Sequence, residues 1–366
     1  MSPTPIIPNI NKLTQTKLLP NVKKKWRHQL MFGLKAFALR PFQSTSGNAR
    51  QIISNTNTAS RNSERLLANI HLANQFGILF DALCQIKPSH FINCDHSDLS
   101  GLTAFVGAVQ TRNGRAVPCL IETTYSDRLP SMPTAPKRRQ KLRKDRSEER
   151  KEVNFTEHYI DALQGLAERL GFWPKLVFDR GFGNESLAVF LDSSNATFYV
   201  RLKAGRLIEL DGQKTTVAHL AENDATVELF GLTLRVVRSD KKRRTKEPWH
   251  ILTNDHTSSR ERIIRIYYHR FEIEETFRDM KHIWELRRTR LNKPVSLKVI
   301  LWLVSIGIAL LYLSAKVVMK VLAEKTGLRT KTHPKKKLSW VRQAYEQLQR
   351  DCTSPRRSLP FWGLGF

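Results

Sequence analysis

The sequence predicts a mixed α/β fold with a β-rich insertion and helical regions at both ends. Residues 175–203 alternate strand, helix and strand, as an α/β core does. Residues 204–253 contain only short β-prone runs, broken by turn signals such as Asp211-Gly212. A long amphipathic helix follows, from about Ser258 to Arg288. We therefore expect a helical region at 1–88, an α/β core made of 89–203 and 254–320, the insertion at 204–253 and a basic C-terminal region at 321–366.

The composition indicates a globular protein with a polyanionic partner. Of 366 residues, 40% are apolar, which is near the average for folded domains. There are 61 Lys and Arg against 33 Asp and Glu, giving a formal net charge of +28. Such an excess favours binding to DNA or RNA, with an anionic membrane surface as the rival partner.

The cysteines, the N-terminus and the longest apolar stretch argue against zinc-binding, disulfide-rich, secreted and membrane-spanning proteins. The four cysteines include no C-x-x-C pair, so neither a zinc site nor a disulfide framework is indicated, and a reducing compartment fits. Residues 1–20 show no secretory signal pattern. Val299–Ala315 is uncharged but shorter than the roughly 20 residues of a spanning helix, so it predicts a buried core helix. A basic membrane protein remains the alternative.

Helices and strands can be placed in order along the chain. Residues 21–90 are helical in pattern, and Arg50–Ser54 and Ser63–Leu83 flank a polar turn at Asn55–Thr58. This pair fits a helix-turn-helix unit and equally a plain helical pair. Three strands in an antiparallel meander follow, with an Asn113-Gly114 hairpin between the last two. The strands are Phe91–Cys94, Leu102–Gln110 and Ala116–Ile121.

Later elements alternate before the insertion begins. A basic loop at residues 126–152 is either a solvated loop or a phosphate contact. A helix from about Asn154, a strand at Lys175–Asp179, a helix near Asn184–Leu191 and a strand at Phe198–Lys203 follow. Within the insertion, the predicted strands are Leu207–Leu210, Thr215–His219, Thr226–Leu229, Leu232–Val237 and Trp249–Thr253.

Two aspartates follow or interrupt predicted strands. Asp179 ends an apolar strand, and α/β folds place ligand sites at the carboxyl ends of strands. Asp95 closes or interrupts the first strand of the meander, and Asp98 competes with it for the same role. Each of these residues also fits an ordinary turn or cap.

The long helix places four polar residues together. Tyr267, Arg270, Glu274 and Lys281 fall within an arc of about 60° at ~100° per residue. An apolar stripe lies beside them, formed by Ile266, Ile273, Phe277, Met280 and Trp284. An amphipathic helix with intrahelical ion pairs explains this pattern as well.

Three carboxylates on two strands and a helix suit two-metal phosphodiester chemistry. Hard divalent cations prefer oxygen ligands. Two ions held ~3.5–4 Å apart activate an attacking water or 3′-hydroxyl and stabilise the leaving oxygen. A basic surface would recruit the nucleic acid.

At this point the motifs resemble a known family. Tyr267-x2-Arg270-x3-Glu274-x6-Lys281 resembles the Y-x2-R-x3-E-x6-K signature of bacterial insertion-sequence transposases of the cut-and-paste DDE group. Asp179-Arg180-Gly181-Phe182 is similar to the family's second aspartate segment. Asp95-His96 is similar to the first, although the family more often has an aromatic residue after this aspartate. The resemblance spans about residues 89–315.

The resemblance implies the fold, the metal and the partners. It implies an RNase H-like core with an inserted β-domain, two Mg²⁺ or Mn²⁺ ions, and a bacterial cytoplasmic, nucleoid-associated location. The partners would be double-stranded DNA, namely the terminal inverted repeats and target DNA, bound by a homodimer with no membrane. The implied metal ligands are Asp95, Asp179 and Glu274, and the implied DNA contacts are Tyr267, Arg270, Lys281 and Trp249.

Three alternatives stay open. Trp249 is either a base-stacking residue or a buried core residue. A metal-dependent nuclease on the same core would cut DNA without rejoining it. A non-catalytic DNA-binding protein would bind DNA through its basic surface without cleaving it.

Overall fold

The structure is a computed structural model with two compact units. It describes residues 12–22, 26–27, 29–30, 33–34, 56–99, 101–111, 114–126, 155–239, 247–284, 286, 291 and 293–326. The first unit comprises Met1–Ile86, Val106–Thr123 and Phe271–Phe366, and the second comprises Lys87–Phe105 and Thr124–Arg270. The predicted helix at Arg50–Ser54 and the basic runs at 137–146, 241–244 and 335–337 lie outside the described residues.

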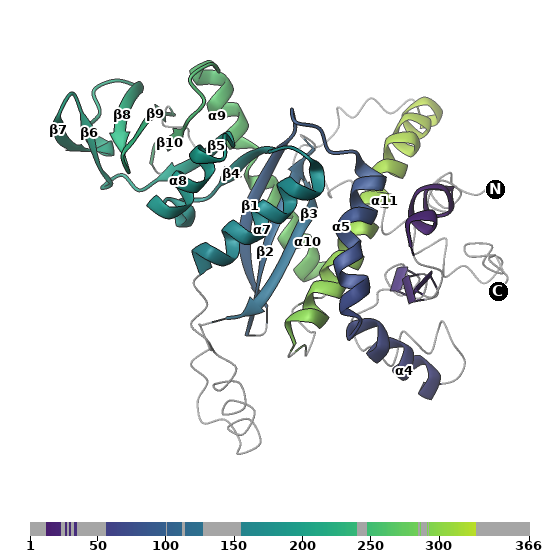
Figure 1. The fold of residues 1–366 in the computed structure, drawn as a ribbon. Coiled ribbons are helices and arrows are strands. Elements are labelled where there is room, and N and C mark those ends of the chain that lie inside the picture. The colour runs from purple at the N-terminus through teal and green to yellow at the C-terminus, as the bar shows by residue number, and fades with distance from the viewer. Residues whose placement is uncertain are drawn as a thin grey trace, which may run out of the picture. The chain divides into compact units, whose positions relative to one another are not determined.

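The second unit is built on a mixed sheet (Figure 1). Its strands lie in the order β1-β4-β5-β10-β9-β8-β6-β7. Strands β1, β4 and β5 are parallel, and β10 is antiparallel to both β5 and β9. The bounds are β1 Phe91–Leu99, β4 Lys175–Phe178, β5 Phe198–Leu202, β6 Leu207–Leu210, β7 Gln213–Thr216, β8 Asp224–Leu229, β9 Leu232–Arg238 and β10 His250–Thr253.

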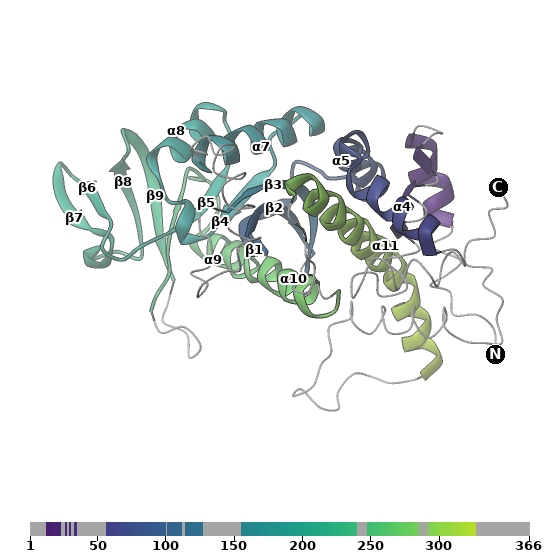
Figure 2. The same ribbon diagram turned by 90° about the horizontal axis from the view of Figure 1, so that it is seen from below.

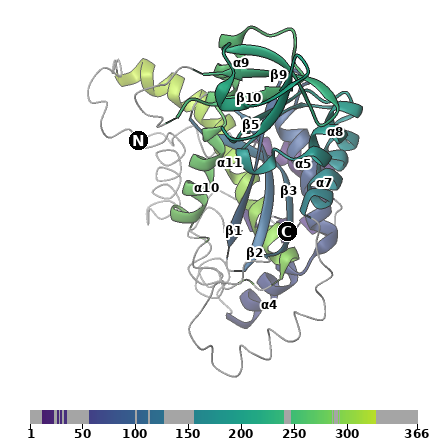
Figure 3. The same ribbon diagram turned by 90° about the vertical axis from the view of Figure 1, so that its left-hand side faces the viewer.

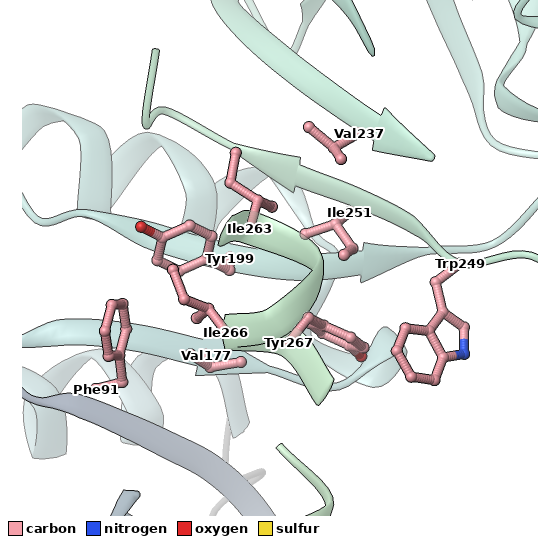
Figure 4. Packing of buried hydrophobic residues seen from close by; sticks show 9 residues of the cluster. All are labelled: Phe91, Val177, Tyr199, Val237, Trp249, Ile251, Ile263, Ile266 and Tyr267. Atoms are coloured by element: carbon pink, nitrogen blue, oxygen red, sulfur yellow. The ribbon is translucent and has the colours of Figure 1, made fainter. Parts of the chain in front are cut away.

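Helices cover both faces of this sheet. Helices α7 (Phe155–Leu170) and α8 (Glu185–Ser193) lie side by side on one face, and α9 (Arg260–Tyr268) lies on the other (Figures 2 and 3). Because successive strand residues point to opposite faces, Val177 of β4 packs toward α9 and Phe178 packs toward the other side. The core under α9 consists of Phe91, Val177, Tyr199, Val237, Trp249, Ile251, Ile263, Ile266 and Tyr267 (Figure 4).

The strands of the predicted insertion continue the sheet of the α/β part. Two-residue turns at Asp211-Gly212 and Phe230-Gly231 have positive φ at both residues, which suits tight hairpins. Strand β10 pairs with β5 on one side and β9 on the other. A separate inserted domain therefore stays a prediction, since residues 207–238 extend the same sheet through β10.

One predicted strand of the insertion is wrong in its second half. Strand β7 ends at Thr216, and a 3₁₀ turn, η4 (Val217–His219), follows. The backbone N–H groups of Val217 and Ala218 donate to the carbonyls of Arg206 and Ala204. These bonds turn the chain inward, and Val217 is buried.

An aspartate organises the connection from β10 to α9. Asp255 Oδ2 accepts a hydrogen bond from the Tyr199 hydroxyl at 2.6 Å. Its Oδ1 accepts from Thr257 N and Oγ1 and from Ser258 N, at 3.0, 2.9 and 2.9 Å. Burial opposes the charge, but the hydrogen bonds from Ser258, Tyr199 and Thr257 hold the pKa of Asp255 well below its usual range. The start of α9 is thus tied to the core of the sheet.

The helices of the first unit pack around α11. Helices α4 (Thr56–Leu67) and α5 (Ile70–Cys84) contact α11 (Pro294–Thr326), and the short helices η1 (Thr14–Leu18) and η2 (Leu19–Asn21) pack against α5. The Trp302 ring lies 6.3 Å from Phe76 and 6.2 Å from Phe80. An apolar core therefore joins these helices.

Part of α11 is long and apolar enough to cross a membrane. This part, Pro294–Leu313, passes by length and composition alone, and it is mostly buried in the protein. Such burial agrees with the core helix predicted from Val299–Ala315.

The N-terminal helices turn at a different place from the predicted one. Residues 56–58, predicted as a turn, begin α4, and the break lies at Ala68-Asn69. The Asn69 side chain accepts a hydrogen bond from Leu72 N and so caps α5.

In the first unit, α10 (Phe271–His282) is fastened to the ends of β2 (Leu102–Gln110) and β3 (Ala116–Tyr125). Glu272 accepts hydrogen bonds from Thr111 N and Gly114 N at 2.9 and 3.2 Å. Thr276 Oγ1 both accepts from Ala116 N and donates to Ala116 O. The buried face of α10 is thus fixed by polar as well as apolar contacts.

Candidate active site

The pairing register of two parallel strands brings two aspartates together. In the second unit, Cys94 of β1 is the partner of Phe178 of β4. Asp95 and Asp179 are the residues that come next in the chain, and both follow buried strand segments. Parallel strands end at the same edge, so the two carboxylates lie at the carboxyl edge of the β1–β4 pair. Strand β1 continues to Leu99, so Asp95 lies within the strand instead of closing it.

One guanidinium group links the two aspartates. Arg270 Nη1 lies 3.6 Å from Asp95 Oδ2, and Arg270 Nη2 lies 3.8 Å from Asp179 Oδ1. The side chains of Arg270, Asp95 and Asp179 are 4%, 16% and 39% exposed. The pair is therefore sheltered on the Asp95 side and open to solvent on the Asp179 side.

Two aromatic residues support Arg270. Its guanidinium carbon lies 5.9 Å from the centre of the Tyr267 ring. Tyr267 in turn packs edge to face against Trp249, with ring centres 5.4 Å apart (Figure 4). Trp249 is 3% exposed, so of the two interpretations left open by the sequence, the core position is the one observed. A base-stacking role for Trp249 stays a prediction and would require it to become accessible.

The surroundings distinguish Asp95 from Asp98. Burial raises the pKa of Asp95, while Arg270 and a 2.8 Å hydrogen bond from His96 N oppose that rise. Asp98 is exposed and accepts a hydrogen bond from Thr103 Oγ1 at 2.6 Å. Asp98 thus has a local structural role, and Asp95 is the aspartate that shares Arg270 with Asp179.

An aromatic cluster that the sequence alone did not single out anchors the Asp179 segment. The chain after Asp179 forms a short 3₁₀ helix, η3 (Arg180–Phe182), whose Phe182 is buried. The Phe182 ring lies 5.1 Å from Tyr159, 5.5 Å from Phe178 and 5.8 Å from the His96 ring. In the sequence, the aromatic Phe182 shortly after Asp179 is the sign of this anchor.

The predicted continuous helix from Ser258 to Arg288 is wrong. Helix α9 ends at Tyr268 and α10 begins at Phe271. At the break, the N–H groups of His269 and Arg270 donate to the carbonyls of Ile266 and Tyr267, the tighter i→i−3 pattern of a helix end. Tyr267 therefore lies on α9, Arg270 follows that helix, and Glu274 and Lys281 lie on α10, so the predicted shared face of these four residues stays a prediction.

Glu274 and Lys281 lie on α10, which belongs to the first unit. Glu272, Thr276 and Asp279 of α10 are buried, and Glu274 is exposed on another side of the helix. Lys281 Nζ lies 6.0 Å from the centre of the Phe277 ring, one helical turn earlier. The predicted meeting of Glu274 with Asp95 and Asp179 stays a prediction.

The donor set of the aspartate pair suits a hard divalent cation. Carboxylate oxygens are the ligands that Mg²⁺ and Mn²⁺ prefer. A buried carboxylate such as Asp95 gains from any cation that offsets its charge. Within the described ranges, no group of three or more His, Cys, Asp or Glu residues is placed to hold a metal ion. Asp95 and Asp179 would supply two ligands of such a site, and any third ligand would come from outside this pair.

Comparison with known proteins points to one kind of domain. Residues 149–311, somewhat less than half of the chain, match the family model described as "Transposase DDE domain". That segment includes Asp179, Tyr267, Arg270, Glu274 and Lys281. The match supports a DDE transposase.

The other two comparisons add little. No curated protein matches the chain. One similar solved structure is titled "Cryo-EM structure of piggyBac transposase synaptic complex with hairpin DNA (SNHP)". It is 10% identical, with a TM-score of 0.41, and the alignment covers 97% of this chain and 81% of that one. A TM-score of this size does not establish a common fold.

Proposed function

We propose that this chain is the transposase of an insertion sequence, which cleaves the element's ends and transfers the 3′-hydroxyl ends into target DNA. The observation that carries the proposal is the pair of aspartates at the edge of β1 and β4, joined by Arg270. The match of residues 149–311 to a transposase domain supports the same reading. The core would be RNase H-like, with the β-rich segment as its insertion.

Each proposed site residue has a distinct task. Asp95, Asp179 and Glu274 would hold Mg²⁺ or Mn²⁺. Two bound ions supply the activation of the attacking oxygen and the stabilisation of the leaving oxygen. Arg270 offsets the negative charge of Asp95 and Asp179, and the Tyr267 ring packs against its guanidinium group.

Binding of DNA follows from charge. The formal net charge of +28 favours a phosphate backbone as the partner. We infer that a homodimer brings two element ends together, with Lys281 and Arg270 near the cleaved strand. Terminal inverted repeats and target DNA are then the two substrates.

The decisive experiment uses the full-length protein and DNA that carries the sequences flanking its gene. With Mn²⁺ or Mg²⁺, the parent protein should cut at the element ends and join a labelled 3′-hydroxyl end to a target plasmid. Asp179→Asn should abolish both steps and leave DNA binding nearly unchanged, because a metal ligand does not bind phosphate. Asp98→Asn is the matched control, since Asp98 lies on the same strand as Asp95 and accepts a hydrogen bond from Thr103 Oγ1.

The outcomes separate the candidate functions. Cleavage without joining would indicate a nuclease on the same core. Binding without metal-dependent cleavage would indicate a non-catalytic DNA-binding protein. Loss of binding and cleavage together in Asp179→Asn would point to a folding role for that residue.

A further inference from the structure

The break between α9 and α10 is held by a side chain from the first strand. Asn93 Nδ2 of β1 donates a hydrogen bond of 2.9 Å to the carbonyl oxygen of His269. Carbonyls in the last turn of a helix lack intrahelical partners, and a sheltered one needs another donor. Asn93 supplies that donor from a residue 176 positions away.

Packing alone does not explain an asparagine at this position. Asn93 is 0% exposed, and its strand neighbours Phe91, Ile92 and Cys94 are buried apolar residues. Burial of an amide costs free energy unless its hydrogen bonds are made. The pairing of β1 with β4 uses backbone groups, so an apolar side chain would serve the strand equally well. The amide of Asn93 therefore has a task beyond the strand.

That task concerns Arg270, the residue after His269. Asn93 and Asp95 are two positions apart on β1 and so point to the same face of the sheet. The strand that holds the His269 carbonyl thus also carries one of the two carboxylates that face Arg270. The contacts of Arg270 with Asp95 and Asp179, 3.6 and 3.8 Å, are longer than the ~2.7–2.9 Å of a charge-assisted hydrogen bond. The backbone anchor is consistent with a guanidinium held slightly back from both carboxylates.

We propose that Asn93 is a positioning residue: through the His269 carbonyl, it holds Arg270 close enough to balance Asp95 and Asp179 but back from direct hydrogen bonds. This rests on the proposed role of the two aspartates as metal ligands. Without the anchor, Arg270 settles onto the carboxylates and competes with a divalent cation for the same oxygens. Metal affinity, and not only stability, therefore depends on Asn93.

The test measures Mn²⁺ affinity of the full-length protein by calorimetry, without DNA. Asn93→Leu keeps a similar volume but cannot donate, and it should weaken Mn²⁺ binding by up to about tenfold, the equivalent of one hydrogen bond. The same change in an Arg270→Gln background should have almost no effect, because the competing guanidinium is gone. Cys94→Ala, at the adjacent buried position of β1, is the control for general loosening of the strand.

Hydrogen exchange gives a second readout that does not require metal. The backbone amides of residues 266–271 should exchange faster in Asn93→Leu, while those at the start of α9 stay protected by the Asp255 contacts. Unchanged exchange there would overturn the anchoring role.

The results distinguish the two proposals. A parent protein that binds no Mn²⁺, or an Asp95→Asn variant that binds it equally well, would remove the metal site and this inference with it. Mn²⁺ binding that is lost in Asp95→Asn but unchanged in Asn93→Leu would overturn the positioning role alone. The same would follow if Cys94→Ala weakened binding as much, or if Asn93→Leu acted equally in the Arg270→Gln background.

Discussion

The carboxylate that ties β10 to α9 allows a prediction with a worked magnitude. Asp255→Ala removes the carboxylate that accepts four hydrogen bonds. The donors are the Tyr199 hydroxyl, Thr257 N and Oγ1, and Ser258 N. Tyr199 is fully buried, so its hydroxyl would lose its charged partner inside the core. A buried donor without its partner costs about 1–3 kcal/mol. The groups of Thr257 and Ser258 are only partly buried and can bind water, so we expect a total loss of about 3–4 kcal/mol.

A double-mutant cycle isolates the buried part of this loss. In a Tyr199→Phe background the hydroxyl is absent, so Asp255→Ala should cost about 1–2 kcal/mol less than in the parent. Amide hydrogen exchange in β5 and β10 measures the opening free energy of this unit directly. Glu261→Ala is the control, because that side chain is 69% exposed at the start of α9. A cost below about 1 kcal/mol, or an equal cost in both backgrounds, would refute the reasoning.

The same carboxylate predicts acid sensitivity. Although burial opposes its charge, the hydrogen bonds from Ser258, Tyr199 and Thr257 lower the pKa of Asp255 in the folded state. A carboxyl group with a lowered folded pKa contributes stability above its ordinary pKa of about 3.9, and this stability is lost as the pH falls below it. Asp255→Asn should therefore flatten the loss of stability on acidification below about pH 4.

Three further predictions concern the residues around the site. Trp249→Ala should lower stability by about 3–5 kcal/mol in urea unfolding, and a loss of strand transfer at unchanged stability would instead favour base stacking. Lys281→Gln should reduce the slope of log affinity for DNA against log salt by about one, and an unchanged slope would exclude a phosphate contact. Thr276→Val should cost about 2–3 kcal/mol, because Ala116 N loses its acceptor and the carbonyl of Ala116 or Glu272 loses its donor; a neutral effect in hydrogen exchange of α10 would contradict this.

Local patterns predicted most elements of the fold correctly. Strands β2 and β6 have the predicted bounds, and the hairpin turns at Asp211-Gly212 and Gly231 lie where the turn residues indicate. These features depend on alternation and on backbone conformations that few residues accept. They can therefore be recognised without knowledge of the tertiary structure.

The errors come from contacts between distant segments. No glycine or proline marks the end of α9, and the carbonyl of His269 is instead bonded by Asn93, far away in the sequence. The strand predicted to extend through His219 instead turns at Val217. There the N–H groups of residues 217 and 218 donate to the carbonyls of residues 206 and 204. A single sequence contains no local sign of either contact.

The candidate site was predictable to the extent that it depends on strand ends. Asp95 and Asp179 both follow predicted strands, and parallel pairing of those strands places them together. The position of Arg270 between them depends on how α9 lies on the sheet and on where it ends, which spacing alone does not specify. The aromatic support by Tyr267 and Trp249 depends on the same packing.

The place of β10 in the sheet has a consequence for synthesis on the ribosome. Strand β10 pairs with β5, yet about fifty residues separate them in the chain, so β5 has an open edge until β10 emerges. Asp95 and Asp179 can meet as soon as β4 is made, whereas Arg270 arrives only after β10 and α9. The nascent protein therefore holds two neighbouring carboxylates before the arginine that pairs with both of them has been made.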